Sequence, residues 1–255
     1  YIGANGNNHS QSGVIVSDHD ELFRITYNYT KLMYEYRGQE QMFEFRKLVN
    51  EMNNEQIDLI NSGRGDEIPA DEQIVYLGTE EDPVFELYFT PFGGSADAWD
   101  TERNPICKYI DKLPLSTDYV ELIWNEYGYG VWHVGNIMEK MVADAFCNNP
   151  NPNNKIAIRV SGFNTDPIKE LELGTEIGYR SIKSGSGIHS KDILLSYVEN
   201  GVRHNVSLLT SCNFYMIAWN FRTNSLLVIN ETEESGGNFY EIFADKYSYG
   251  AIKND

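Results

Sequence analysis

Between residues 84 and 161 the sequence alternates segments that are typical of strands with segments that are typical of helices. "VFELYFTP" and "YVELIW" are rich in the β-branched and aromatic residues that strands favour, and "KIAIRVSG" is a third such segment. "NPICKYIDKL" and "WHVGNIMEKMVADAFC" have apolar residues at helical spacing. Strands that alternate with helices predict the α/β class, with a mixed or mainly parallel sheet and helices on both of its faces.

The two ends of the chain follow one plan, which is a short apolar strand, a polar break and a helix. Near the start we predict a strand over residues 14–16, a cap at Ser17 or Asp18, and a helix over residues 22–36. Near the end, "NSLLVIN" predicts a strand, and the aromatic residues within 239–247 predict a helix. The repetition indicates the closing part of one lobe followed by a whole second lobe of the same design.

A polar, acidic stretch separates these parts. A further helix is expected over residues 42–49, and "NSGRGDEIPADE" is the most loop-like segment after it. We therefore expect residues 1–50 to be the C-terminal part of a first lobe, residues 51–82 to connect the lobes, and residues 83–255 to form the second lobe.

Charge and hydropathy narrow the choice of partners. The chain has 255 residues, with 38 acidic and 20 basic side chains and a net charge of -18. Such a surface repels polyanions at long range, which disfavours nucleic acid as a partner without excluding it. No apolar run reaches the roughly 18 residues of a spanning helix, and the start at Tyr1 does not look like a signal peptide.

Cysteines and glycosylation signals bear on the compartment. Cys107, Cys147 and Cys212 lack the spacing of metal ligands, and their odd number allows at most one internal disulfide. We therefore expect no metal site. The sequence holds four Asn-x-Ser/Thr sequons, at Asn8, Asn28, Asn205 and Asn230. These sequons would permit glycosylation, so they favour a secreted or lumenal protein.

The candidate site lies in "GSGIHSKDILLSYVENGVRHNVSLLTSCNF", residues 185–214. Residues i and i+2 of a strand point to the same face, so a strand that starts at Ile188 would direct His189 and Lys191 into one pocket. Asn-Gly at 200–201 predicts a tight hairpin turn, and "NVSLLTS" predicts the returning strand.

This ordered set of residues resembles the phospholipase D superfamily, whose signature is H-x-K-x4-D followed by G-S-x-N. His189 and Lys191 match the first motif, and Thr210-Ser211-x-Asn213 resembles the second. The resemblance implies two α/β lobes that share one phosphodiester site, with no cofactor. His189 would be the proton donor, Lys191 a fixed positive charge, Asn213 an amide donor and Ser211 a hydroxyl that binds substrate. It also implies that no metal is needed, because lysines and histidines supply the charge and the proton transfer.

The resemblance requires a second histidine, for which we consider two sources. In the first interpretation, which we prefer, a preceding segment or a second chain completes the first lobe. "YIGAN" is then a remnant of the first G-S-x-N, with Asn5 as a substrate-binding residue. In the second interpretation, His9-Ser10-Gln11 is a degenerate first motif in which glutamine has replaced lysine.

Two departures from the family pattern define a rival function. Ser196 stands where the family has the motif aspartate, and Thr210 stands where it has glycine. Our leading hypothesis is a phosphodiesterase that forms a phosphohistidine intermediate, with a lipid favoured over nucleic acid because of the negative charge. The alternative is a structural or binding protein of the same fold with an eroded site.

Overall fold

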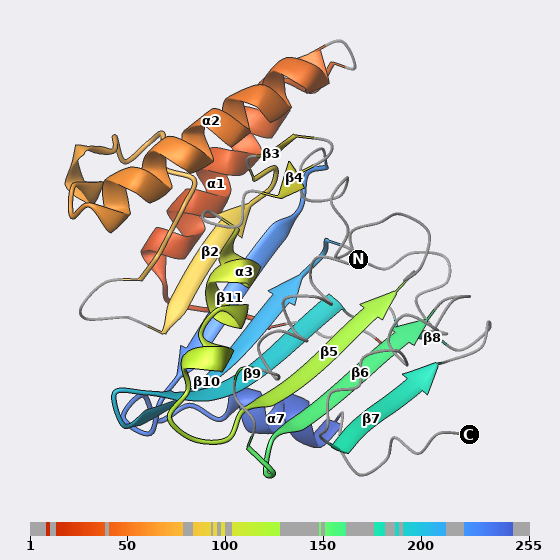
Figure 1. The fold of residues 1–255 in the computed structure, drawn as a ribbon. Coiled ribbons are helices and arrows are strands. Elements are labelled where there is room, and N and C mark those ends of the chain that lie inside the picture. Colours follow the sequence, from red (N-terminus) through yellow and green to blue (C-terminus); the bar gives the residue numbers. More distant parts are fainter. Residues whose placement is uncertain are drawn as a thin grey trace.

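The computed structural model describes most of the chain, and Figure 1 shows its course. The described residues are 9–10, 14–38, 41–78, 84–92, 94–95, 98–99, 104–127, 148, 151–161, 176–181, 187–188, 191–212 and 222–246. The helix expected within residues 132–147 lies outside them.

A seven-stranded mixed sheet forms the centre of the molecule. Its order is β2 (Phe85–Phe89), β11 (Ser225–Glu231), β10 (Val202–Thr210), β9 (Lys191–Glu199), β5 (Glu121–Tyr127), β6 (Lys155–Ser161) and β7 (Glu176–Ser181). β5, β6 and β7 are parallel to one another, and the other neighbours are antiparallel. The predicted α/β class, the mixed sheet and its predicted strands are therefore confirmed, and β7 is a further strand that was not predicted from the sequence.

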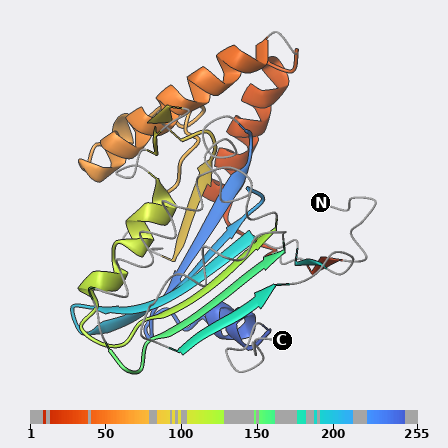
Figure 2. The ribbon, with the colours of Figure 1, turned by 45° about the vertical axis from the view of Figure 1, so that its right-hand side comes forward.

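Helices cover both faces of the sheet, as predicted (Figures 1 and 2). On one face α1 (Asp20–Glu35), α2 (Met42–Asn61) and α3 (Pro105–Ile110) pack on β2, β11, β10, β9 and β5, through core residues such as Phe45, Ile106 and Trp124. On the other face α7 (Phe239–Lys246) packs Tyr240 and Phe243 on Ile123 and Leu194. Burial of these apolar surfaces is the main stabilising term for both layers.

The start of α1 differs from the prediction. Residues 14–16 form no strand: Ile15 is 96% exposed, and the segment pairs with no described strand. Helix α1 is capped by His19, whose Nδ1 accepts a hydrogen bond from the backbone N–H of Leu22 at 3.3 Å. The predicted caps at Ser17 and Asp18 are wrong, because an imidazole nitrogen fills the position that usually holds a hydroxyl or carboxylate.

Helix α2 is longer than predicted. It continues from Met42 to Asn61 and is followed by Gly63 at a φ of 74°. Its second half is polar in sequence, yet Asn53 and Gln56 are buried and bind backbone groups of neighbouring segments. The helix crosses residue 50, where we expected the first part of the chain to end; the division into lobes remains a prediction.

The β9–β10 hairpin forms where the sequence predicts it. Asn200 and Gly201 take φ values of 53° and 81°, which a tight turn between twisted strands requires. The pairing of the hairpin extends from Val202 with Glu199 to Thr210 with Lys191. Its register therefore places the two ends of the motif segment side by side.

Shorter elements complete the described part of the chain. β1 (His9–Ser10) pairs in parallel with β8 (Gly187–Ile188), and β3 (Gly94–Ser95) pairs with β4 (Ala98–Trp99). The two 3-10 helices are η3 (Gly65–Glu67) and η4 (Leu113–Leu115). None of the described helices is long and apolar enough to span a membrane.

One glycosylation signal is unfavourable in the folded chain. Asn28 is 7% exposed, and its Nδ2 donates hydrogen bonds of 2.9 Å to the backbone oxygens of Ala70 and Gln73. A glycan on this nitrogen would displace both bonds. Asn28 is therefore a structural residue that ties α1 to the segment before β2.

Candidate functional site

The candidate site lies at one edge of the sheet. The parallel strands β5, β6 and β7 all end there, and the antiparallel register places the start of β9, the end of β10 and the start of β11 at the same edge (Figure 1). The chain adds β6 and β7 on one side of β5 and returns with β9 on the other side. In open α/β sheets, ligands bind outside the carboxyl ends of the strands at such a switch point.

Lys191 is the first residue of β9, and it is only 5% exposed. Its backbone is paired with Thr210 on β10, so the side chains of these two residues lie on the same face of the sheet. Asp192, on the opposite face, is 3% exposed. The register thus joins the Lys191 motif to the Thr210 motif, as expected.

Thr210 and Ser211 fix the end of β10. The Oγ1 of Thr210 donates a hydrogen bond to the backbone oxygen of Ser225 at 2.7 Å and accepts one from the backbone N–H of Cys212 at 2.9 Å. The Oγ of Ser211, an exposed residue, accepts a hydrogen bond from the backbone N–H of Ser225 at 3.3 Å. A glycine at position 210 could not make the side-chain bonds, so this departure from the family pattern has a structural role.

The other predicted site residues, His189, Asn213 and Asn5, lie outside the described residues. The described backbone on each side of them still restricts the site. The strand expected from Ile188 is confirmed from Lys191 onward, whereas Gly187 and Ile188 form β8 in a separate sheet with β1. His9 and Ser10 therefore run beside the two residues that directly precede His189.

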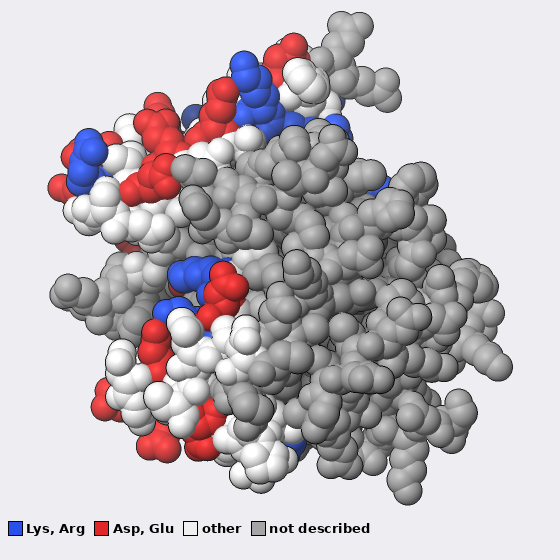
Figure 3. Space-filling view, in the orientation of Figure 1, with Lys and Arg blue, Asp and Glu red and all other residues white. Residues whose placement is uncertain are grey.

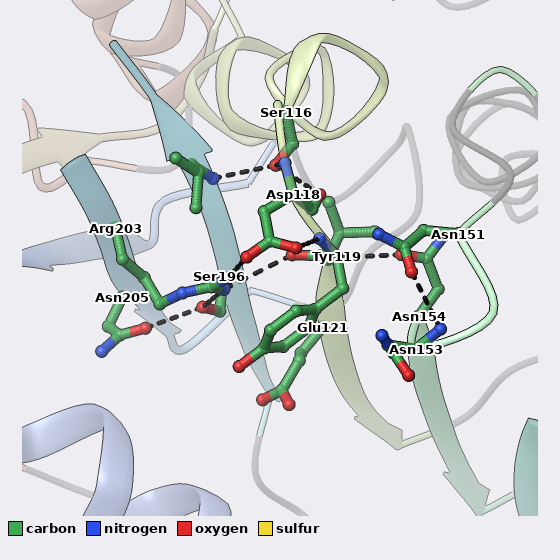
Figure 4. Close-up of polar contacts among 12 residues, drawn as sticks. Ser116, Asp118, Tyr119, Glu121, Asn151, Asn153, Asn154, Ser196, Arg203 and Asn205 are labelled. Carbon is green, nitrogen blue, oxygen red and sulfur yellow. Dashed lines mark hydrogen bonds and ion pairs between the residues drawn. The ribbon is translucent and has the colours of Figure 1, made fainter. Parts of the chain in front are cut away.

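Ser196, at the position of the family aspartate, lies towards the opposite edge of the sheet (Figure 4). Its hydroxyl donates a hydrogen bond to Oδ1 of Asn205 at 2.8 Å and accepts one from Arg203 at 3.0 Å. Arg203 also pairs with Asp118 at 3.2 Å and lies 4.0 Å from the ring centre of Tyr119. This network ties the β9–β10 hairpin to the segment before β5.

Glu86 on β2 is a buried carboxylate with three partners, two of which come from α3. It accepts hydrogen bonds from the hydroxyls of Tyr88 at 2.6 Å and Tyr109 at 2.9 Å, and it pairs with Lys108 at 2.9 Å. Burial raises the pKa of both tyrosines well above the ordinary value, and the negative charge of Glu86 raises it further. The cluster links α3 to the sheet and lies apart from the motif edge.

Charge on the described surface agrees with the composition. The exposed side of α2 carries Glu44, Glu51, Glu55 and Asp58. Figure 3 shows acidic side chains gathered over the α1–α2 hairpin, with lysine and arginine between them. Within the described ranges, no three His, Cys, Asp or Glu side chains form a group that could hold a metal ion. Cys107 and Cys212 are both buried.

Sequence reasoning missed two residues at this edge, Thr90 and Asn224. The backbone N–H of Asn224 donates a hydrogen bond to Oγ1 of Thr90 at 2.7 Å, across 134 positions of sequence. No local pattern identifies such a contact. A threonine before a proline reads only as the end of a strand.

Comparison with known proteins gives structural likenesses only. No protein-family model matches the sequence, and no curated protein matches it significantly. Among solved structures, the chain is similar to polyphosphate kinase from Porphyromonas gingivalis, with 15% identity and a TM-score of 0.43. This match covers 67% of the present chain but only 24% of the kinase chain.

Two further solved structures are similar at about the same level. One is a phospholipase D family member, Nuc from Salmonella typhimurium, with 13% identity, a TM-score of 0.40 and coverage of 65% of this chain and 94% of that one. The other is NucT from Helicobacter pylori, with 13% identity, a TM-score of 0.39 and coverage of 66% and 94%. Because these TM-scores lie below 0.5, we base the function proposed below on the residues and their geometry.

Proposed function

We propose that this chain is a phospholipase D-like phosphodiesterase that hydrolyses a lipid or another phosphodiester at the carboxyl edge of its sheet. The observation that carries the proposal is the pairing of Lys191 with Thr210. It brings Lys191 of the H-x-K motif and Ser211 of the Ser-x-Asn motif, 20 positions apart in the sequence, to one edge where α/β sheets bind ligands.

The residues at this edge suit the chemistry of a phosphodiester. The ammonium group of Lys191, the amide of Asn213 and the hydroxyl of Ser211 are the groups that would neutralise or hydrogen-bond the non-bridging oxygens. One imidazole would attack phosphorus while His189 gives its proton to the departing alkoxide. Water would then cleave the phosphohistidine, releasing a phosphomonoester and restoring both histidines.

The source of the second histidine is part of the proposal. The β1–β8 pairing supports the second interpretation of the sequence, in which His9-Ser10-Gln11 is a degenerate first motif, because it holds His9 beside the residues that precede His189. A preceding segment or a second chain stays the other source. The acidic exposed side of α2 favours lipid or small diesters over nucleic acid.

The rival function is an inactive structural or binding protein of the same fold. It is favoured by the serine at position 196, which takes part in an Arg203–Asp118 network in place of the motif acid. The two functions differ in one measurable respect, which is turnover of a phosphodiester by the intact chain.

We expect the intact chain to hydrolyse a lipid phosphodiester with an alkoxide leaving group, such as phosphatidylcholine in mixed micelles, and His189→Ala to lower kcat/KM at least about a hundredfold, since positioned acid–base groups contribute about that much or more. His9→Ala should cause a similar loss if His9 is the second histidine. His204→Ala is the control, because His204 stacks on Tyr197 near the hairpin turn, far from the motif edge. No turnover by the intact chain, or equal turnover by His189→Ala, would favour the rival.

A further inference from the structure

The described residues on either side of the segment that carries Asn213 are bound by threonine hydroxyls. Its entry, Ser211–Cys212, follows Thr210 on β10, and its exit, residues 222–224, leads into β11. Thr210 bonds to the entry and to the first residue of β11, as described above. Residues 222–224 are bound by a second threonine, Thr90. It follows β2, the strand that lies on the other side of β11 from β10.

Thr90 directly follows β2 and is fully buried, at 0% exposure. Its Oγ1 donates a hydrogen bond to the backbone oxygen of Arg222 at 2.5 Å and accepts one from the backbone N–H of Asn224 at 2.7 Å. Its own backbone N–H donates to the backbone oxygen of Asn224 at 2.9 Å. Three hydrogen bonds from one residue therefore fix the exit of the segment.

The α1–α2 hairpin in turn holds Thr90. Asn53 of α2, also at 0% exposure, donates from Nδ2 to the backbone oxygens of Phe89 at 2.6 Å and Pro91 at 2.7 Å. The hydroxyl of Tyr29 on α1 lies 3.4 Å from the backbone oxygen of Thr90. A set of hydrogen bonds thus runs from the helical hairpin, through Thr90 and its neighbours Phe89 and Pro91, to residues 222–224.

We propose that Thr90 is a positioning residue for the candidate site, and that through it the α1–α2 hairpin holds residues 222–224, which follow the segment that carries Asn213, at the motif edge. The part of this inference that concerns catalysis rests on the proposed function. The part that concerns residues 222–224 stands on the hydrogen bonds alone. A buried hydroxyl with both a donor and an acceptor role is costly to replace, because its two partners would be left unsatisfied.

Hydrogen exchange tests the structural part. In Thr90→Val, which keeps the shape and removes the hydroxyl, we expect the amides of Ser211, Asn224 and Ser225 to exchange about fivefold faster or more, since the segment opens locally. Thr90→Ser, which keeps the hydroxyl, should stay near the unmodified chain. Thr26→Val is the matched control: it also removes a threonine hydroxyl bonded to a backbone oxygen, but on the exposed side of α1.

Activity tests the catalytic part. In the same series we expect Thr90→Val to lower kcat about tenfold with little change in KM, because a misplaced amide weakens transition-state contacts. Thr90→Ser should restore kcat. A residue that only supports the fold would lower the unfolding temperature and leave kcat unchanged well below it.

The experiments distinguish a failure of the inference about Thr90 from a failure of the proposed function. Unchanged exchange at Ser211, Asn224 and Ser225 in Thr90→Val would overturn the inference, whatever the activity. Faster exchange in a chain whose turnover does not depend on His189 would support Thr90 as a positioning residue and reject the proposed function instead. If Thr90→Val does not fold, hydrogen exchange of the unmodified chain still tests the inference. The amide of Asn224 must then be protected to the same degree as the amides in the interior of β11. Rapid exchange of the Asn224 amide would contradict the inference.

Discussion

The folded chain is expected to lose about 4 kcal/mol of stability between pH 10 and pH 11, because four buried tyrosines do not ionise in the native state. Burial raises the pKa of Tyr29, Tyr88, Tyr109 and Tyr197 well above the ordinary value near 10, and Glu86 adds to the shift at Tyr88, Tyr109 and Tyr197. As the pH rises through 10, the unfolded chain releases these protons while the folded chain retains them. Stability is therefore complete below about pH 9 and falls as the pH rises, by about 1 kcal/mol per tyrosine between pH 10 and pH 11 and by up to about 1.4 kcal/mol per tyrosine per pH unit above that.

Urea unfolding followed by circular dichroism from pH 8 to pH 11 measures this loss. The double variant Tyr88→Phe/Tyr109→Phe should be less stable at pH 8, since Glu86 loses two hydrogen-bond donors. Above pH 10, however, its stability should fall about half as steeply, because two of the four tyrosines are gone. Tyr34→Phe, at a 65% exposed position, is the control and should keep the full slope. An unchanged slope in the double variant would show that these tyrosines do not cause the loss.

Replacing Glu231 with alanine is expected to lower the free energy of unfolding by about 3 to 5 kcal/mol, the sum of two hydrogen bonds to a charged, buried group. Glu231, at the end of β11, is 3% exposed. Its carboxylate accepts hydrogen bonds from the backbone N–H groups of Phe239 at 2.8 Å and Tyr240 at 2.7 Å. These are orphan donors in the first turn of α7, and a negative charge there also suits the helix dipole. Without it, α7 loses two of the hydrogen bonds that hold its first turn on the sheet.

A matched control and a second variant sharpen this test. Glu233→Ala removes an exposed acid two residues away and should change stability by no more than about 0.5 kcal/mol. Gly237→Ala should also destabilise, because a Cβ at position 237 would overlap Oε1 of Glu231. Chemical denaturation gives the free energies, and hydrogen exchange of the α7 amides shows where the loss occurs. Equal stability of the Glu231 and Glu233 variants would contradict the role assigned to the cap.

The sheet could be predicted from sequence because its signals are local. "FELYF", "ELIW" and the Asn-Gly turn each combine strand-forming residues with a clear end, and all become the predicted elements. The predictions that failed have a common cause: the structure at these positions depends on whether a distant segment makes contact, which local sequence patterns do not reveal. Val14–Val16 found no strand to pair with, and the second half of α2 is helical because Asn53 and Gln56 bind backbone from distant segments.

The same difference between local signals and tertiary contacts applies to the candidate site. The hairpin register follows from the turn at Asn200–Gly201, so the pairing of Lys191 with Thr210 was predictable. The contacts that fix the edge were not. Thr90 reaches Asn224 only because β2 lies beside β11, and no sequence pattern marks the hydrogen bond between Ser196 and Arg203.

A structure of the chain with bound tungstate, a dense tetrahedral stand-in for phosphate, tests the central claim most directly. We expect one anion at the carboxyl edge of the sheet, with Nζ of Lys191 and the amide of Asn213 within about 3.5 Å of its oxygens and the imidazole of His189 beside it. An anion bound elsewhere, or these three side chains pointing away from one another, would contradict the assignment of a phosphodiester site to this edge.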